Sequence, residues 1–208
     1  MGDCTIIDPS RSPEITNRYG QIYYEKRARK GITLLEATRK MRQRTYFGTM
    51  MVELGEADAF ISGQNRNYPD TIRPALEIIG KEEGTNKVAG MYIIMSKQGP
   101  LFFADTTVNI DPTSDDLVDI VKLIHKSVNK LQIKPRIAML SYSNFGSAKG
   151  KTVTNIQKAL KRLNTENPEI LVDGEMQANT ALDAELRQEL FPFCKLGSEN
   201  ANVFIFPA

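Results

Sequence analysis

A polar, glycine-containing turn is the segment of this sequence with the clearest potential for chemistry. Residues 145–152 read FGSAKGKT and follow an apolar run at 137–140. Glycine-rich turns between a strand and a helix present backbone N–H groups to phosphate. A nucleotide-binding P-loop is excluded, because Gly146 and Gly150 are separated by three residues and that motif needs four. An anion site and an ordinary capped connection remain as readings of the polar residues here, which are Ser141, Ser143, Asn144 and Ser147.

An arginine near a helix start is the second candidate for binding an anion. Arg73 follows Pro69 and Asp70, which lead an apolar helical pattern after a polar loop. The positive end of the helix dipole favours negative charge at this position. The alternative is a surface ion pair of Arg73 with Asp70 or Glu77. A further basic group, Arg27 with Arg29 and Lys30, either joins a basic cleft or forms a solvated helix face, and the sequence favours the solvated face.

The acidic residues predict caps rather than a metal site. Four aspartates precede a predicted helix without the spacing of a calcium loop, so capping is the better interpretation; they are Asp105, Asp111, Asp115 and Asp116. A second polar group is either catalytic or orders a turn, and its members are Asp173, Glu175 and Gln177. His125 is the only histidine and lies on an apolar helix, and Cys194 has no CxxC partner, so neither residue is expected to take part in catalysis.

Composition limits the class of protein. The 208 residues are 41% hydrophobic, and 27 basic against 25 acidic residues leave a net charge of +2. Such a balance gives no general attraction to nucleic acid or to an anionic membrane, so we expect neither as a partner. Two cysteines and the absence of a signal-like or membrane-spanning apolar run favour a reducing cytoplasm.

Strand and helix patterns alternate after an all-helical start. This order predicts an α/β fold whose mixed sheet contains a β-hairpin and is covered by helices. We expect a helical segment at residues 1–56 and a central α/β domain at residues 57–208. Because a terminal apolar run is followed only by Pro207 and Ala208, we expect a piece of a longer polypeptide. Helices are expected at 17–30, 33–43, 46–54, 69–80, 114–128, 153–163 and 181–190, with Ser114 as a cap, and strands at 59–61, 88–95, 101–104, 136–140, 169–172 and 202–206.

Several segments carry a family resemblance. RARKGITLLEATRKM, YFGTMMVELGEADAFISG, TIRPALEIIG, DPTSDDL, AMLSYSNFGSAKG, DGEMQANTAL and ANVFIFP are similar, in order and spacing, to the central region of the phosphate acetyl/butyryl transferases. The resemblance implies an isocitrate/isopropylmalate dehydrogenase-like fold of the phosphotransacetylase type, a homodimer, and a cleft for acetyl-CoA or another phosphate-bearing ligand. The residues that it implies for this cleft are Arg27, Arg73, Ser62, Gly63, Asn65, Tyr68, Asp70, Ser141, Ser143, Asn144, Gly146 and Ser147.

Within that family, ADTTVNIDPT, SYSNFGS and DGEMQA resemble the domain fused behind bacterial NADP-dependent malic enzymes. Stand-alone family members tend to carry His-Ser-Thr where this sequence has Arg66-Asn67-Tyr68, and their catalytic Ser-Arg motif lies beyond the Phe-Pro near residue 207. The resemblance therefore implies a non-catalytic domain that dimerises and senses acetyl-CoA. Its alternatives are a working phosphate acetyltransferase and a ligand-free dimerisation domain. No dinucleotide fingerprint or metal-ligand cluster is present, so NADP and a divalent metal are expected only in a malic enzyme domain elsewhere in the polypeptide.

Overall fold

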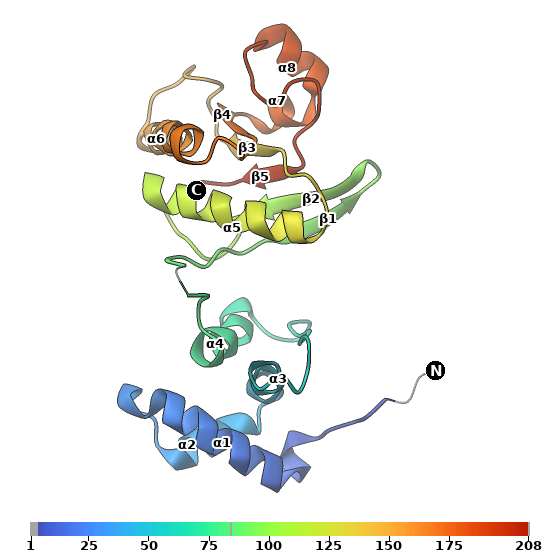
Figure 1. Ribbon diagram of the computed structural model, residues 1–208, viewed down its shortest axis with the longest axis vertical. Helices are drawn as coiled ribbons and strands as arrows, with labels where there is room; N and C mark the ends of the chain where they lie inside the picture. Colours follow the sequence, from blue (N-terminus) through green and yellow to red (C-terminus); the bar gives the residue numbers. More distant parts are fainter. Residues whose placement is uncertain (1–3, 84, 208) are drawn as a thin grey trace. The chain divides into compact units, whose positions relative to one another are not determined.

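The computed structural model describes residues 4–83 and 85–207. The chain forms two compact units, Met1–Glu83 and Gly84–Ala208, and each is described separately below (Figure 1). No helix in the described ranges is both long and apolar enough to cross a membrane.

The first unit consists of helices around a small aromatic core. Its α-helices are α1 (Pro13–Arg27), α2 (Leu34–Met41), α3 (Arg44–Glu53) and α4 (Tyr68–Ile78), with short 3-10 turns at Pro9–Arg11 and Ala28–Lys30. A glycine directly after the helical pattern at 17–30 predicts a helix stop, and Gly31 ends the first helical segment in the left-handed conformation, at φ 85°. The spacing of Thr33 and Glu36 in the sequence predicts a capping box, and this box is present at the start of α2. The core side chains are Tyr19, Tyr23, Ala37, Met41, Tyr46, Phe47, Met50 and Ile78.

Helix α4 packs in this first unit, so the predicted boundary between residues 56 and 57 falls inside the unit. Ile78 is 3% exposed within the aromatic core, and Tyr23 on α1 donates a hydrogen bond to Glu77 at 2.7 Å. The helical spacing of Ile72, Ala75, Leu76 and Ile79 predicts that these residues form the buried face of α4, but that face is displaced. Pro74 and Ile78 are buried, whereas Leu76 and Ile79 are 43% and 49% exposed.

The strand predicted at residues 59–61 is wrong. These residues form part of an irregular connection, and Ile61 is 95% exposed. The segment pairs with none of the five strands in the described sheet, so its backbone groups have no ladder to join. The Phe60 ring lies directly against Gly48 of α3. A short apolar run in the sequence does not distinguish a strand from a loop that buries an aromatic side chain in this way.

The second unit contains a five-stranded mixed sheet in the order β1-β2-β5-β3-β4. The strands are β1 (Tyr92–Ser96), β2 (Gly99–Ala104), β3 (Ile137–Leu140), β4 (Val172–Met176) and β5 (Val203–Ile205). Only β1 and β2 are antiparallel, and they form the predicted hairpin. The remaining pairs are parallel. The mixed α/β class predicted from the alternating pattern is therefore confirmed.

Helices cover both faces of this sheet, as expected for parallel strands. Ile137 and Met139 point into a core shared with α5 (Ser114–Lys130) and α6 (Lys151–Glu166). Ala138 and Leu140, which alternate with them, join a second core beside α7 (Ala178–Leu182) and α8 (Ala184–Leu190). Figure 1 shows the α7 and α8 pair on the opposite side of the strands from α5.

Three local predictions in this unit need correction. The strand expected at 169–172 is displaced towards the C-terminus. Strand β4 begins only at Val172 and runs through the polar residues Asp173 and Glu175, whose side chains have partners inside the protein. The cap of α5 is Thr113, paired reciprocally with Asp116, instead of Ser114. The helix expected at 181–190 is divided at Asp183, whose carboxylate accepts from Leu186 N and caps α8.

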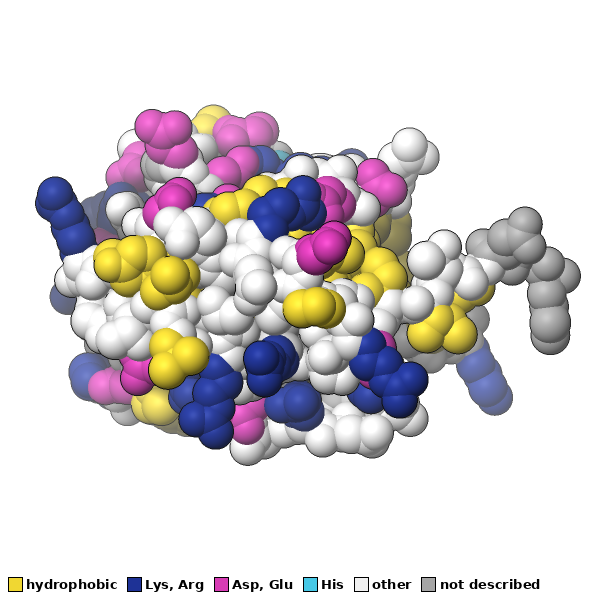
Figure 2. Space-filling view, turned by 90° about the horizontal axis from the view of Figure 1, so that it is seen from below, with side chains coloured by type: hydrophobic (Ala, Val, Ile, Leu, Met, Phe, Trp, Pro, Cys, Tyr) yellow, Lys and Arg dark blue, Asp and Glu magenta, His cyan; other side chains and the backbone are white. Residues whose placement is uncertain are grey.

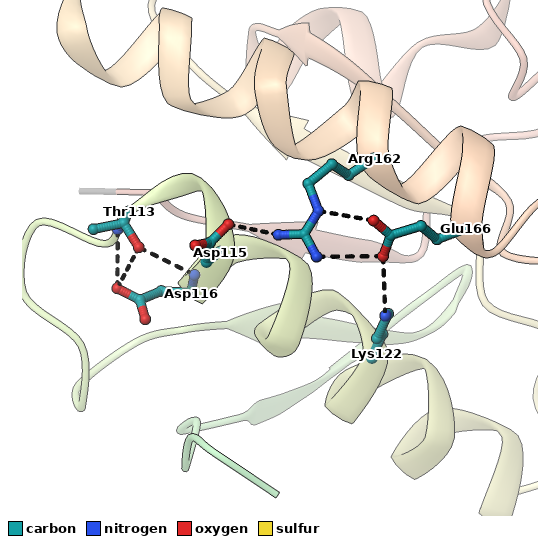
Figure 3. A network of polar contacts seen from close by, with 6 residues as sticks. All are labelled: Thr113, Asp115, Asp116, Lys122, Arg162 and Glu166. Atoms are coloured by element: carbon teal, nitrogen blue, oxygen red, sulfur yellow. Dashed lines mark hydrogen bonds and ion pairs between the residues drawn. The ribbon is translucent and has the colours of Figure 1, made fainter.

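The aspartates have structural partners. Asp115 pairs with Arg162 at 2.5 Å, Asp116 completes the box of α5, and Asp111 pairs with Lys151 at 2.5 Å. Figure 3 shows the first two, of which Asp115 joins α5 to α6 through Arg162. Among the described residues, no group of three or more His, Cys, Asp or Glu side chains is placed to hold a metal ion.

Asp105 fixes the loop after β2. It is 8% exposed and accepts from the backbone N–H of Gly90 at 2.8 Å and Asn109 at 2.7 Å, with further bonds from Thr107, Val108 and the Asn109 amide. Burial alone would raise the pKa of this carboxyl, but the N–H donors outweigh burial and lower its pKa. The loop therefore depends on an ionised Asp105.

We expect Asp105→Asn to lower the free energy of unfolding by about 2–3 kcal/mol at neutral pH, because its amide NH₂ would face the donors of Asn109. A pKa lowered by folding stabilises the fold above the unfolded-state pKa of about 3.9, and that contribution is lost as the pH falls through the folded-state pKa. Urea titrations of both proteins between neutral and acidic pH should thus converge on acidification. A constant difference in unfolding free energy across this range would contradict the assignment.

Candidate functional site

A basic pocket of about 920 Å³ lies in the helical unit. The turn between α2 and α3 supplies Arg42 to its lining, and the first turn of α3 supplies Arg44 and Thr45. The loop before α4 forms the opposite wall and supplies Arg66. Asp70 is the one carboxylate among the described lining residues. Figure 2 shows Lys and Arg side chains gathered along part of the face seen from below. The pocket thus combines three guanidinium groups with a single acid.

The loop residues predicted for the cleft are brought to this pocket. Ser62, Gly63, Asn65 and Asp70 line it. The geometry follows from the local sequence, because Asn67 caps α4 by accepting from Asp70 N at 3.1 Å and so turns the polar loop into the helix. Arg66-Asn67-Tyr68, which stands where family members tend to carry His-Ser-Thr, therefore contains the cap and the first residue of α4.

Two predicted residues on α4 lie outside this lining. Tyr68 is the first residue of α4 and is 39% exposed. Arg73 is exposed, and none of the ion pairs in the described part of the chain joins it to Asp70 or Glu77. The surface ion pair considered for Arg73 is therefore not formed, and its phosphate role stays a prediction.

Arg27 lines a second pocket, of about 510 Å³, together with Lys30, Lys40 and Glu77. Its guanidinium lies 3.6 Å from the Glu77 carboxylate. Gln43 borders both pockets, so the turn between α2 and α3 separates them. Arg27 is thus held by an acid within its own unit.

A polar cluster that sequence reasoning missed surrounds that acid. Glu77 accepts from Tyr46 at 2.6 Å and Tyr23 at 2.7 Å, and Lys40 lies 3.2 Å from it. Burial and the bond to Glu77 raise the pKa of Tyr23 to about 12. Burial would raise the pKa of Glu77, but donation by the two tyrosines and Lys40 outweighs it and lowers that pKa. These residues come from four helices, so no local spacing identified them.

The turn at 141–147 is tied to the protein by its own polar groups. Ser143 Oγ donates to Glu175 at 3.0 Å, and Gly146 N donates to the same carboxylate oxygen at 2.6 Å. Asn144 N donates to Ser147 Oγ at 2.9 Å. Glu175 is 1% exposed, so a buried carboxylate of the chain already accepts from two donors of this turn. The geometry favours the capped connection over the anion site.

The neighbouring polar residues share this structural task. Gln177 donates from its backbone to Asn144 Oδ1 at 2.7 Å and from its side chain to Tyr142 O at 2.9 Å. Asp173 accepts from Lys195 N at 2.7 Å. Of the two interpretations left open for this group, ordering of a turn is the one that these contacts support. Whether the turn faces the arginines of the helical unit stays a prediction.

Cys194 lacks the properties of a nucleophile. It is 7% exposed, and burial raises the pKa of its thiol to about 11.

The fold resembles solved phosphotransacetylases. The structure of the EutD phosphotransacetylase from Staphylococcus aureus aligns with a TM-score of 0.81 at 32% identity, over 100% of this chain and 63% of that chain. These values place the chain among α/β proteins of the phosphotransacetylase type. The family model described as Phosphate acetyl/butaryl transferase matches residues 1–208. The chain belongs to this family, and the family resemblance read from the sequence is confirmed.

Individual relatives favour the acetyltransferase branch. The Clostridium acetobutylicum protein named phosphate acetyltransferase is 35% identical over 97% of this chain and 62% of its own length. The NADP-dependent malic enzyme of Salmonella typhimurium is 32% identical over 99% of this chain but only 27% of that enzyme. The predicted preference for a malic enzyme domain is thus the less supported reading. The chain therefore spans only about three-fifths of the length of the Clostridium protein.

Proposed function

We propose that this chain is the substrate-binding part of a phosphate acetyltransferase, which exchanges an acetyl group between coenzyme A and inorganic phosphate. The observation that carries the proposal is the pocket with Arg42, Arg44 and Arg66, into which the family's polar loop also projects Ser62 and Asn65. A guanidinium presents several N–H donors in a fixed plane and so suits phosphate oxygens. We infer the acetyl group as the group transferred, and phosphate as its acceptor, from the names of the similar proteins.

The proposed reaction needs little from this unit beyond binding and orientation. A phosphate oxygen forms a bond to the acetyl carbon, the bond from that carbon to sulfur breaks, and the phosphate proton passes to the departing thiolate. Fixed positive charge beside the phosphate holds it in place against the acetyl carbon. We expect the residues that assist the departing thiolate in the part of the relatives' sequences that this chain does not cover.

Sensing of acetyl-CoA by a malic enzyme domain is the second candidate function. The likeness to the Salmonella enzyme supports it, as does Arg66-Asn67-Tyr68, in which Asn67 serves as a helix cap. In this reading NADP and a divalent metal belong to another domain. A homodimer and a cytoplasmic location also remain proposals, and sedimentation equilibrium tests the first of them.

Both functions require acetyl-CoA to bind in the arginine pocket. We expect Arg66→Ala, in the product of the complete gene, to weaken acetyl-CoA binding about 10-fold, since one hydrogen-bonded charge contact is lost. Calorimetric titration measures this change. Arg11→Ala is the matched control, because the Arg11 side chain is 87% exposed in the same unit and lies outside the pocket. Equal affinities of the wild type and Arg66→Ala would contradict the proposed site.

A further inference from the structure

Helix α3 begins without a side-chain cap. Its N-cap residue, Gln43, makes no capping bond, whereas Thr33, Asn67 and Thr113 cap α2, α4 and α5. The first backbone N–H groups of any α-helix lack partners inside the helix. Gln43, Arg44 and Thr45 line the 920 Å³ pocket, so the uncapped end of this ten-residue helix opens on it.

A buried hydroxyl at this helix start also lacks a partner. Thr45 is 2% exposed, and its Oγ1 makes no hydrogen bond within the described structure. Buried polar side-chain atoms nearly always have a partner. Thr49, one turn further along α3, shows the usual case, because its hydroxyl donates to Thr45 O at 2.7 Å. Thr45, which carries this unpaired hydroxyl, lines the same pocket as the uncapped helix start.

The charge around this helix start is positive. Arg42 precedes the helix, Arg44 is its first residue, and Arg66 lies on the facing loop. Asp70 is the opposing charge in the lining. The helix dipole adds to the guanidinium groups rather than opposing them. Backbone N–H donors, a hydroxyl and arginines together match a group with several acceptor oxygens and more than one negative charge.

We propose that the N-terminus of α3, with Thr45 and Arg44, is a subsite for a phosphate group. It deepens the proposed function, on which it rests for the kind of substrate. The phosphate is either free inorganic phosphate or a phosphate of acetyl-CoA, since both present the same oxygens. This subsite uses the first residues of α3 and is distinct from Arg27 and Arg73.

The test titrates the 208-residue chain with inorganic phosphate and, separately, with acetyl-CoA, using calorimetry. We expect Thr45→Val to weaken binding about 5- to 10-fold, and Arg44→Gln about 10-fold or more, because each removes a donor to a charged group. Thr49→Val is the matched control, since it removes a buried hydroxyl of the same helix outside the pocket and should leave affinity unchanged. Thr45→Ser keeps the hydroxyl and should therefore bind both ligands as tightly as the wild type.

The outcomes of these titrations decide whether the subsite binds phosphate and which ligand occupies it. Weaker binding of inorganic phosphate assigns it to the free anion, and weaker binding of acetyl-CoA alone assigns it to a phosphate of that ligand. Unchanged affinity for both ligands in Thr45→Val and Arg44→Gln, with normal circular dichroism, would overturn the proposal. A complete gene product that fails to transfer acetyl groups, while these variants still lose phosphate binding, would reject the proposed function and leave the subsite standing.

Discussion

Replacing Arg187 with methionine should lower the free energy of unfolding of the sheet-containing unit by about 3–5 kcal/mol. Arg187 is fully buried, and its guanidinium donates to the carbonyls of Thr180 and Ala181 at 3.0 and 3.1 Å. It also donates to Gly197 O at 3.0 Å and Glu199 O at 2.6 Å. One side chain therefore connects α7 and α8 to the loop that leads into β5. Methionine fills similar space but leaves four carbonyls without these donors.

Arg162→Met provides the matched control in the same unit. Arg162 is also held by several oxygens, those of Asp115 and Glu166, but its side chain is 43% exposed (Figure 3). Exposed ion pairs contribute little because water competes for both partners. Urea unfolding should show a large shift for Arg187→Met and little or none for Arg162→Met. Similar small shifts in both variants would mean that the buried arginine does not hold this region together.

Glu175→Ala should lower the free energy of unfolding by about 2–4 kcal/mol, because it leaves buried donors unpaired. The lost bonds are those from Ser143 Oγ at 3.0 Å, Gly146 N at 2.6 Å and Gln157 Nε2 at 3.2 Å. The same substitution should loosen the 141–147 turn, which hydrogen exchange at Gly146 measures.

Glu175→Gln separates shape from charge in this contact. It keeps the size of the side chain but places an amide NH₂ near either Gly146 N or the Gln157 amide, so we expect an intermediate loss of stability. Glu189→Ala, at an exposed position of α8, should have little effect. If Gly146 exchanges as slowly in Glu175→Ala as in the wild type, the buried carboxylate does not order the turn.

Local sequence patterns predicted the parts of the fold that depend on neighbours in the chain. The box of Thr33 and Glu36, the glycine stop at Gly31 and the β1-β2 hairpin all arise within a few residues. Alternating strand and helix then sufficed for the mixed α/β class. In these cases the residues that form the structure are the same neighbouring residues that the pattern in the sequence identifies.

Contacts between distant residues were outside the reach of such patterns. Glu175 meets Ser143 across 32 positions, and Tyr23 meets Glu77 across 54. Polar residues inside β4 and the packing of α4 with the first unit follow from these pairings. The loop residues of the arginine pocket were found through a family resemblance, whereas Arg42 and Arg44 had no spacing that linked them to that loop.

Formation of acetyl phosphate tests the central proposal most directly. Purified product of the complete gene is mixed with acetyl-CoA, and release of the coenzyme A thiol is followed with and without inorganic phosphate. We predict phosphate-dependent thiol release at enzymatic rates, with about 10-fold lower efficiency in Arg66→Ala. Tight binding of acetyl-CoA without any phosphate-dependent thiol release would contradict acetyl transfer and favour a sensing domain.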